Sequence, residues 1–232
     1  MLKLIYHGHA CFSLTDSIED LLIDPFLKGN PLADVQPEEV NPTYILVTHG
    51  HDDHLGDAVE IAQRTGAVII APNELAHYCA CQGVDVAPMH LGGAREFSFG
   101  KIKLTPAWHS SAIITAEKII YTGAPCGFII QMQGKTIYHA GDTGLFGDLK
   151  LIGERYQLDY ALLPIGDNFV MGPEDALEAA VMLQAKVTVP MHYDTFPLIK
   201  QDPYLYVRRL QEKGLNGVVL KPGESRELLP KG

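Results

Sequence analysis

The stretch Tyr44-Ile-Leu-Val-Thr-His-Gly-His-Asp-Asp-His54 decides the fold and the chemistry of this chain. It begins as an apolar run that predicts a strand over Tyr44–Val47, and a helical pattern of apolar residues follows over Leu55–Arg64. Between them, five metal-capable side chains, three histidines and two aspartates, occur within six residues. Solvation of a polar loop does not account for such a cluster, so the stretch predicts a metal site at the end of a strand.

The spacing inside this cluster predicts two metal positions. His49 and His51 lie two residues apart in an extended turn and can share one ion, and Gly50 between them permits a tight turn of the backbone. Asp53 and His54, at the start of the following helix, can share a second ion. Neutral imidazoles and carboxylates suit zinc, iron or manganese.

Four more polar side chains each follow a predicted strand where it enters a loop: Asp24, His109, Asp142 and His192. Functional groups gather at strand ends because the sheet fixes their positions while the loops leave them accessible. Taken singly, each is equally well interpreted as a satisfied polar residue at a strand end. Together with the histidine cluster, they form a pattern of metal ligands distributed along the chain.

The rest of the chain alternates short apolar runs with helical patterns, and nothing marks a boundary, so residues 1–232 are interpreted as one domain. Besides Tyr44–Val47, strands are predicted over Leu2–Tyr6, Leu21–Ile23, Val68–Ala71, Lys101–Thr105, Phe128–Met132, Thr136–Tyr138, Tyr160–Leu163, Val187–Val189 and Val218–Leu220. Further helices are expected over Pro173–Gln184 and Leu205–Lys213. Several strands are apolar on both faces, which is typical of covered sheets. On periodicity alone, an αββα sandwich and a doubly wound α/β sheet both fit.

Composition narrows the classes of partner. The chain is 47% hydrophobic and 20% charged, with a net charge of −10, which disfavours a nucleic-acid partner. No apolar run approaches the ~20 residues of a membrane span, and the N-terminus has no signal-peptide core, so we expect no membrane association and a cytoplasmic location. No CxxC pair occurs, and reduced thiols are expected at all four cysteines: Cys11, Cys79, Cys81 and Cys126.

The order of the candidate ligands resembles the sequence motifs of the metallo-β-lactamase superfamily. The resemblance covers nearly the whole chain and is carried by Asp24, His49-x-His51-x-Asp53-His54, His109, Asp142 and His192. It implies the metallo-β-lactamase fold, an αββα sandwich with a two-metal site along one edge. By this resemblance, one metal is held by His49, His51 and His109, and the other by Asp53, His54 and His192. Asp142 is the implied bridge, and Asp24 lies behind the ligands and orients their loop.

A closer resemblance is to the compact bacterial and archaeal branch of metal-dependent hydrolases that is similar to the ascorbate-6-phosphate lactonases. It is carried by Gly8–Ala10, His139–Phe146, Leu163–Asn168, Met171–Ala176 and His192–Leu198. It places His9 near the metals as a substrate or proton-transfer group; a structural, hydrogen-bonding histidine is the alternative. Asp194 and Val170 stand where asparagine and threonine are usual in that branch, which leaves the ligands intact and affects only substrate contacts.

The leading functional hypothesis is hydrolysis of an ester-like bond of a small molecule, in a lactone, thioester or phosphodiester, by hydroxide bridging two divalent metal ions. Zinc is expected first, with manganese, iron or nickel as alternatives. Asp53 and His9 are the catalytic candidates, because Asp53 can both ligate and orient the nucleophile. The alternatives are a metal-dependent nuclease or RNA-processing enzyme and a non-catalytic metal-binding protein. A homo-oligomer is compatible with the sequence.

Overall fold

The computed structural model describes residues 1–228, and its first sheet runs in the strand order β15–β1–β2–β3–β4–β5–β6. The strands of this sheet are β1 Leu2–Gly8, β2 Cys11–Thr15, β3 Asp20–Ile23, β4 Tyr44–Leu46, β5 Val68–Pro72, β6 Val86–Met89 and β15 Ser225–Leu228. Strands β3, β4, β5 and β6 are parallel, while β15, β1, β2 and β3 pair antiparallel.

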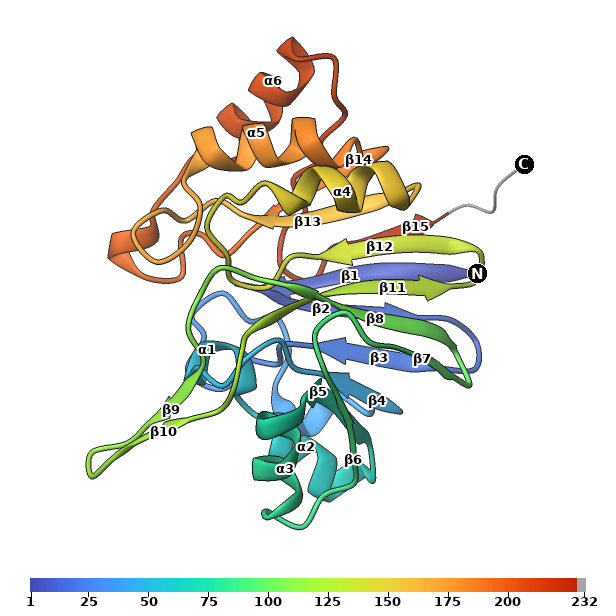
Figure 1. Ribbon diagram of the computed structural model, residues 1–232, viewed down its shortest axis with the longest axis vertical. Helices are drawn as coiled ribbons and strands as arrows, with labels where there is room; N and C mark the ends of the chain where they lie inside the picture. Colours follow the sequence, from blue (N-terminus) through green and yellow to red (C-terminus); the bar gives the residue numbers. More distant parts are fainter. Residues whose placement is uncertain (229–232) are drawn as a thin grey trace.

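The second sheet runs in the order β14–β13–β12–β11–β8–β7. Its strands are β7 Ala94–Phe97, β8 Gly100–Pro106, β11 Cys126–Met132, β12 Lys135–His139, β13 Tyr160–Pro164 and β14 Val187–Met191. Strands β12, β13 and β14 are parallel, and the others pair antiparallel. A separate hairpin of β9 (Ala112–Ile114) and β10 (Ile119–Tyr121) projects from the body of the molecule (Figure 1).

Helices cover the outer face of each sheet, which gives the αββα sandwich (Figure 1). On the first sheet lie α1 Asp52–Leu55, α2 Ala58–Thr65 and α3 Asn73–Ala80; on the second lie α4 Asp148–Arg155, α5 Pro173–Leu183 and α6 Pro203–Glu212. Two 3-10 turns, Pro37–Glu39 and Pro197–Ile199, complete the regular structure of residues 1–228. The main core contains buried side chains from both sheets, among them Leu4, Phe12, Ile102 and Phe128. The doubly wound alternative is therefore excluded.

Two of the predicted elements differ from the structure. Val218–Leu220 is not a strand: only Gly217 bridges to Thr188, because the chain here leaves the edge of β14 to form β15 on the other sheet. The apolarity of the segment reflects packing, since Leu220 is buried in the core. The helix expected over Leu55–Arg64 is divided at Gly56, which has a φ of +41° and whose close approach to the Pro25 carbonyl leaves no space for a side chain.

Three further expectations concern the last helix, the cysteines and membrane-spanning segments. The helix expected over Leu205–Lys213 begins earlier, at Pro203, because the Asp202 side chain caps it by accepting hydrogen bonds from two backbone N–H groups. Cys81 is exposed and the other three cysteines are buried, and none of the four forms a disulfide in the part of the chain that the structure describes. Among residues 1–228, the helices are too short and too polar to cross a membrane.

Candidate metal centre

The predicted ligands lie together where several strands end. The loops after β3, β4, β8, β12 and β14 meet at one edge of the sandwich and bring in Asp24, His49, His109, Asp142 and His192. Helix α1 follows the loop after β4 and adds Asp53 and His54. Backbone hydrogen bonds join the two halves of the sandwich at this edge, from Cys126 N to Thr48 O (3.1 Å) and from His192 N to His9 O (2.7 Å).

One group of potential ligand atoms consists of three histidines. His49, His51 and His109 each offer a ring nitrogen within 4.8 Å of the others. The Nε2 atom of His49 is 2.9 Å from His51 Nδ1, and His109 Nε2 is 3.3 Å from the same atom. This is the set that the sequence motifs assign to the first metal.

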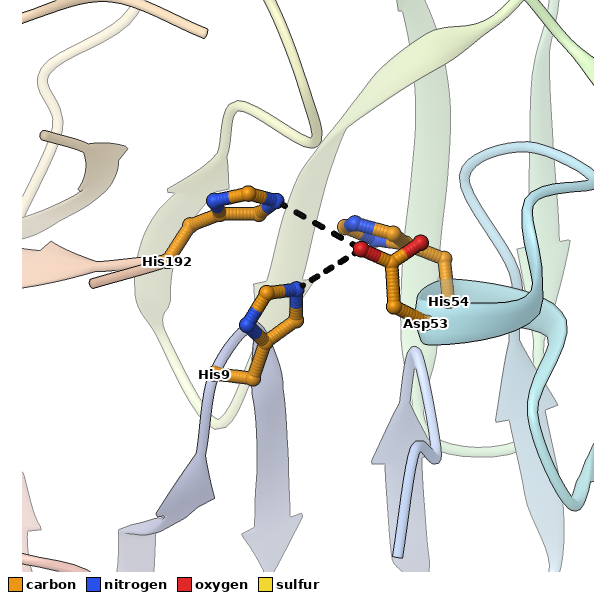
Figure 2. A group of neighbouring side chains, drawn as sticks. All are labelled: His9, Asp53, His54 and His192. Carbon is orange, nitrogen blue, oxygen red and sulfur yellow. Dashed lines mark hydrogen bonds and ion pairs between the residues drawn. The ribbon is translucent and has the colours of Figure 1, made fainter. Parts of the chain in front are cut away.

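A second group surrounds Asp53 (Figure 2). His9, Asp53, His54 and His192 offer ligand atoms within 4.8 Å of one another. The Oδ2 atom of Asp53 is 3.2 Å from His9 Nε2 and 3.9 Å from His192 Nε2. The structure thus adds His9 to the three residues that the motifs place around the second metal.

Asp142 lies between the two groups. Its Oδ2 atom is 3.1 Å from His192 Nε2, 3.6 Å from His109 Nε2 and 4.0 Å from His49 Nε2. Its Oδ1 atom is 3.2 Å from His54 Nε2. A single buried carboxylate therefore reaches histidines of both groups.

Asp24 organises the cluster from behind. The fully buried carboxylate accepts hydrogen bonds from Thr48 N (2.8 Å) and Thr48 Oγ1 (2.7 Å), and lies 2.8 Å from His54 Nδ1. Because Thr48 Oγ1 donates to Asp24, it can only accept from His49 Nδ1, 2.9 Å away. Both His49 and His54 therefore carry a proton on Nδ1 and direct the Nε2 atom into the cluster, an assignment made from the hydrogen-bond network.

Unpartnered buried atoms test whether this cluster fits a cation. Within the described residues, His54 Nε2, Asp142 Oδ1 and His192 Nε2 are buried and have no hydrogen-bond partner. Buried polar atoms without partners are costly, and these two imidazole nitrogens and one carboxylate oxygen are all atoms that can bind a metal ion. A divalent metal would satisfy them, so the donor set fits the metal-dependent chemistry.

His9 is held in a demanding backbone conformation. His9, Asp24 and His192 have φ values of 57°, 44° and 56°, a region that residues other than glycine seldom occupy. Such strain is retained where surrounding structure over-determines it, commonly at functional sites. The His9 ring is fully buried between Asp53 Oδ2 and Thr195 Oγ1, which is 2.8 Å from His9 Nδ1. No sequence pattern marked Thr195 as a partner of His9.

Gly50 matters for a different reason from the one expected. Its φ is not positive; instead, a side chain there would collide with Thr122, which follows β10. Gly50 N donates to Ser111 Oγ (3.0 Å), which lies 2.7 Å from Thr122 Oγ1. The glycine thus allows the arm that carries the β9–β10 hairpin to pack against the turn between His49 and His51.

Electrostatics favour the metal-binding forms of most of these side chains. Burial holds the pKa values of His49, His51 and His109 below the usual histidine range, so their imidazoles are neutral at neutral pH. Burial acts to raise the pKa of Asp142, but His192 and His54 hold it well below the usual range. The pKa of Asp53 is also lowered, against the effect of burial, by its hydrogen bond to His9. Both carboxyls are therefore ionised.

A cavity of about 640 Å³ opens in front of the cluster. Its base includes His51, Asp53, His109, Asp142 and His192. Its walls include Ala112, Ile114, Phe169, Phe196, Pro197 and Leu198, none of which the sequence singled out as functional. Neither Asp194 nor Val170 is among the residues that line it, and His9 lies behind Asp53 rather than on the cavity surface.

An αββα sandwich with a histidine and aspartate cluster at one edge defines a class of metal-dependent proteins. Residues 14–193 match the model of the Beta-lactamase superfamily domain. A UPF0173 metal-dependent hydrolase from Geobacillus sp. (strain WCH70) is 54% identical over 228 residues, covering 98% of this chain and 100% of the relative. Another from Bacillus licheniformis is 52% identical over 228 residues, covering 97% and 99%.

The likeness extends to a solved structure. Igni18, a metallo hydrolase from the hyperthermophilic archaeon Ignicoccus hospitalis, is 37% identical, with a TM-score of 0.89 over 98% of this chain and 99% of that chain. The chain belongs to the UPF0173 metal-dependent hydrolase family of the metallo-β-lactamase superfamily. It is therefore a metal-dependent hydrolase, and the αββα fold expected from the sequence motifs is confirmed.

Proposed function

We propose that the enzyme hydrolyses an ester-like bond of a small molecule, a lactone, thioester or phosphodiester, at a centre of two divalent metal ions. The observation that supports it most is the position of Asp142, whose two carboxylate oxygens approach histidines of both ligand groups. Carboxylate bridges of this kind occur where two metals share a site. The two ligand groups on either side of Asp142 correspond to the two metal positions that the sequence motifs imply.

The ligands divide as follows in this proposal. His49, His51 and His109 would hold one ion, Asp53, His54 and His192 would hold the other, and Asp142 would contribute to both. Divalent metals bound here would supply Lewis acidity and would lower the pKa of water to near 7. Zinc suits this nitrogen and oxygen donor set best, and manganese, iron or nickel are alternatives.

The chain's own groups then orient the reaction. Asp53 lies on the cavity surface, ionised, with Oδ2 bound by His9, and it can accept a hydrogen bond from the attacking water. His9 acts through Asp53, because its other nitrogen is bound to Thr195 and its ring does not reach the cavity. Water adds to the carbonyl or phosphoryl centre, the bond to the leaving oxygen or sulfur breaks, and a proton passes to the leaving group.

The geometry gives no support to the two alternative functions. A nuclease would need cationic side chains that bind the phosphate backbone, but no lysine or arginine is among the described residues that line the cavity, and the net charge is −10. A purely structural metal site is closed by its ligands, whereas these candidate ligands line an open cavity. We therefore propose a small molecule as the partner.

A reconstitution screen tests the proposal. Chelator-treated protein would be loaded with zinc, manganese, iron or nickel and assayed with lactones, thioesters and phosphodiesters. We expect turnover with at least one class and one metal, which Asp53→Ala lowers by orders of magnitude and Asp85→Ala, an exposed loop aspartate, does not. Metal-independent turnover, or turnover that Asp53→Ala leaves unchanged, would contradict it.

A further inference from the structure

Three apolar side chains surround the mouth of the cavity, each from a different segment. Ile114 of β9 is 57% exposed, Phe169 of the loop before α5 is 52% exposed, and Leu198 of the turn Pro197–Ile199 is 67% exposed. Large apolar side chains gathered in this way on a surface are uncommon unless they bind something. Their common position around the candidate metal centre indicates that they contact the substrate.

Ordered structure holds two of these side chains in place. Phe169 follows Asp167 and Asn168, which have φ values of 64° and 50°, and the loop is closed by Asp167 N donating to Met171 O (3.1 Å). Met171 N in turn donates to Thr143 O (3.0 Å), next to Asp142. The loop that presents Phe169 is therefore tied to the segment that carries the bridging carboxylate.

Leu198 has a similar anchor. It precedes Ile199, which is fully buried, and Asp194 N donates to Ile199 O (2.9 Å) to close the loop after His192. A buried anchor beside an exposed side chain fixes the direction of the exposed one. The apolar wall is thus a built feature of the cavity, on the same loop as a candidate ligand.

The charges around the cavity point in the same direction. No lysine or arginine is among the described residues that line it, and the exposed Asp52 is one of them. Lys200 lines a separate hollow beyond Phe196 and Pro197, together with Asp194. An anionic group away from the scissile bond would therefore meet apolar walls and an aspartate instead of a cation.

We propose that the substrate carries an uncharged, apolar acyl or aryl group next to its scissile bond, and that Phe169, Leu198 and Ile114 bind this group. The proposal rests on the proposed hydrolytic function and names its substrate class. A cavity of about 640 Å³ lies within the range of sites that enclose a small molecule of moderate size. A substrate with a phosphate monoester or a carboxylate away from its scissile bond is disfavoured.

Matched esters test the proposal on the metal-loaded enzyme. Hydrolysis of 4-nitrophenyl acetate, butyrate, hexanoate and mono-adipate would be compared, the last two having acyl chains of equal length that differ in a terminal carboxylate. We expect kcat/KM to rise by roughly threefold per added methylene while the chain contacts the wall, and to fall at least tenfold from hexanoate to mono-adipate. Leu198→Ser and Phe169→Ser should flatten the dependence on chain length. Leu151→Ser, a 60% exposed leucine on α4, should leave it unchanged.

Binding gives a second, independent measurement. Calorimetric titration of the metal-loaded enzyme with acetamide and hexanamide should show tighter binding of hexanamide, and Leu198→Ser should remove the difference. Ester turnover without dependence on chain length, or with mono-adipate preferred, would overturn the substrate class and leave the hydrolytic function standing. Absence of all turnover would count against the hydrolytic function, and hexanamide binding no tighter than acetamide would then overturn the substrate class as well.

Discussion

The Asp24 side chain is fully buried, and its two carboxylate oxygens form hydrogen bonds with three groups: Thr48 N, Thr48 Oγ1 and His54 Nδ1. All three belong to the segment after β4 that carries most of the candidate ligands. Through Thr48 and directly, these contacts orient the rings of His49 and His54. Replacement of a group that hydrogen-bonds to a metal ligand typically lowers metal affinity by about 10- to 100-fold, because such groups fix the tautomer and the direction of the ligand.

We predict that Asp24→Asn weakens metal binding by about 10- to 100-fold. An asparagine has one oxygen in place of two, and its amide N–H₂ would face donors. Calorimetric titration with zinc measures the effect. The matched control is Asp57→Asn, whose carboxylate accepts only the backbone N–H groups of Leu27 and Lys28. The control should lose stability and keep its metal affinity; equal losses of affinity in both variants would contradict the role of Asp24.

His9→Ala should separate a positioning group from a ligand. Because His9 reaches the cluster by its hydrogen bond to Asp53, we expect both metals to stay bound while kcat falls by roughly 10- to 100-fold, the range for a group that orients a metal ligand. His9→Gln, which can still bond to Thr195 and Asp53, should recover part of the rate. Metal content and single-turnover rates would be measured on both variants. Loss of one metal from His9→Ala would show instead that His9 is a ligand.

Most strands that are buried on both faces were predicted, with β2 as an exception, and the exposed strands were not. Every residue of β12 and β13 is buried, and apolar runs predicted both strands. Strands β7 and β10 are mostly exposed, so no apolar pattern marks them. The apolar wall of the cavity escaped prediction for a related reason: Phe169 lies in a loop and Leu198 in a single 3-10 turn, where sequence periodicity carries no information about side-chain direction.

The candidate ligands were predictable because their residue types and strand-end positions are chemically specific. Their supporting contacts were not, since they depend on tertiary structure. Thr195 meets His9 across 186 residues of sequence, and Gly50 is required by the approach of Thr122. The division of the helix at Gly56 likewise follows from a contact with Pro25.

Strand β3 begins with a residue whose ionisation opposes folding. Burial raises the pKa of Asp20 to about 6, against a small opposing effect of His7. A folded-state pKa above the unfolded value means that this group's stabilising contribution is complete below about pH 4 and is lost as the pH rises through about 6.

We therefore predict that Asp20→Asn raises the free energy of unfolding at pH 7.5 by about 1–2 kcal/mol, a value reduced for the partial solvent exposure of the carboxyl, and that the gain shrinks toward pH 4. Urea unfolding at both pH values measures it. Asp16→Asn is the control of opposite sign: hydrogen bonds from the backbone N–H groups of Glu19 and Ile18 lower the pKa of Asp16, so this variant should be destabilised at pH 7.5. A pH-independent effect of Asp20→Asn would show that ionisation of Asp20 does not oppose folding.

For the whole molecule, metal binding and proton release should be coupled. Burial alone would lower the pKa of His54, but the carboxylates of Asp142 and Asp24 beside its two ring nitrogens hold it well above the usual histidine value. The metal-free enzyme therefore carries a second proton on His54, at Nε2, at neutral pH, and a metal that binds at Nε2 must displace it.

The predicted result is an apparent zinc affinity that rises roughly tenfold per pH unit near neutrality for each proton displaced. Calorimetry at pH 7 in buffers of different ionisation enthalpy would count the protons released. About one proton is expected from His54. Binding without proton release, at an affinity that does not change with pH, would show that His54 is already neutral or is not a ligand.

In the proposed centre, seven side chains of this hydrolase hold two metal ions, with Asp142 between them. Asp53→Ala removes a ligand from only one group, so the variant provides an internal reference for the count. Elemental analysis of chelator-treated protein, reloaded with excess zinc and freed of unbound metal, counts the bound ions. We expect two ions per chain for the unaltered protein and about one for Asp53→Ala; saturation of the unaltered protein at one ion, or at none, would rule out the two-metal centre.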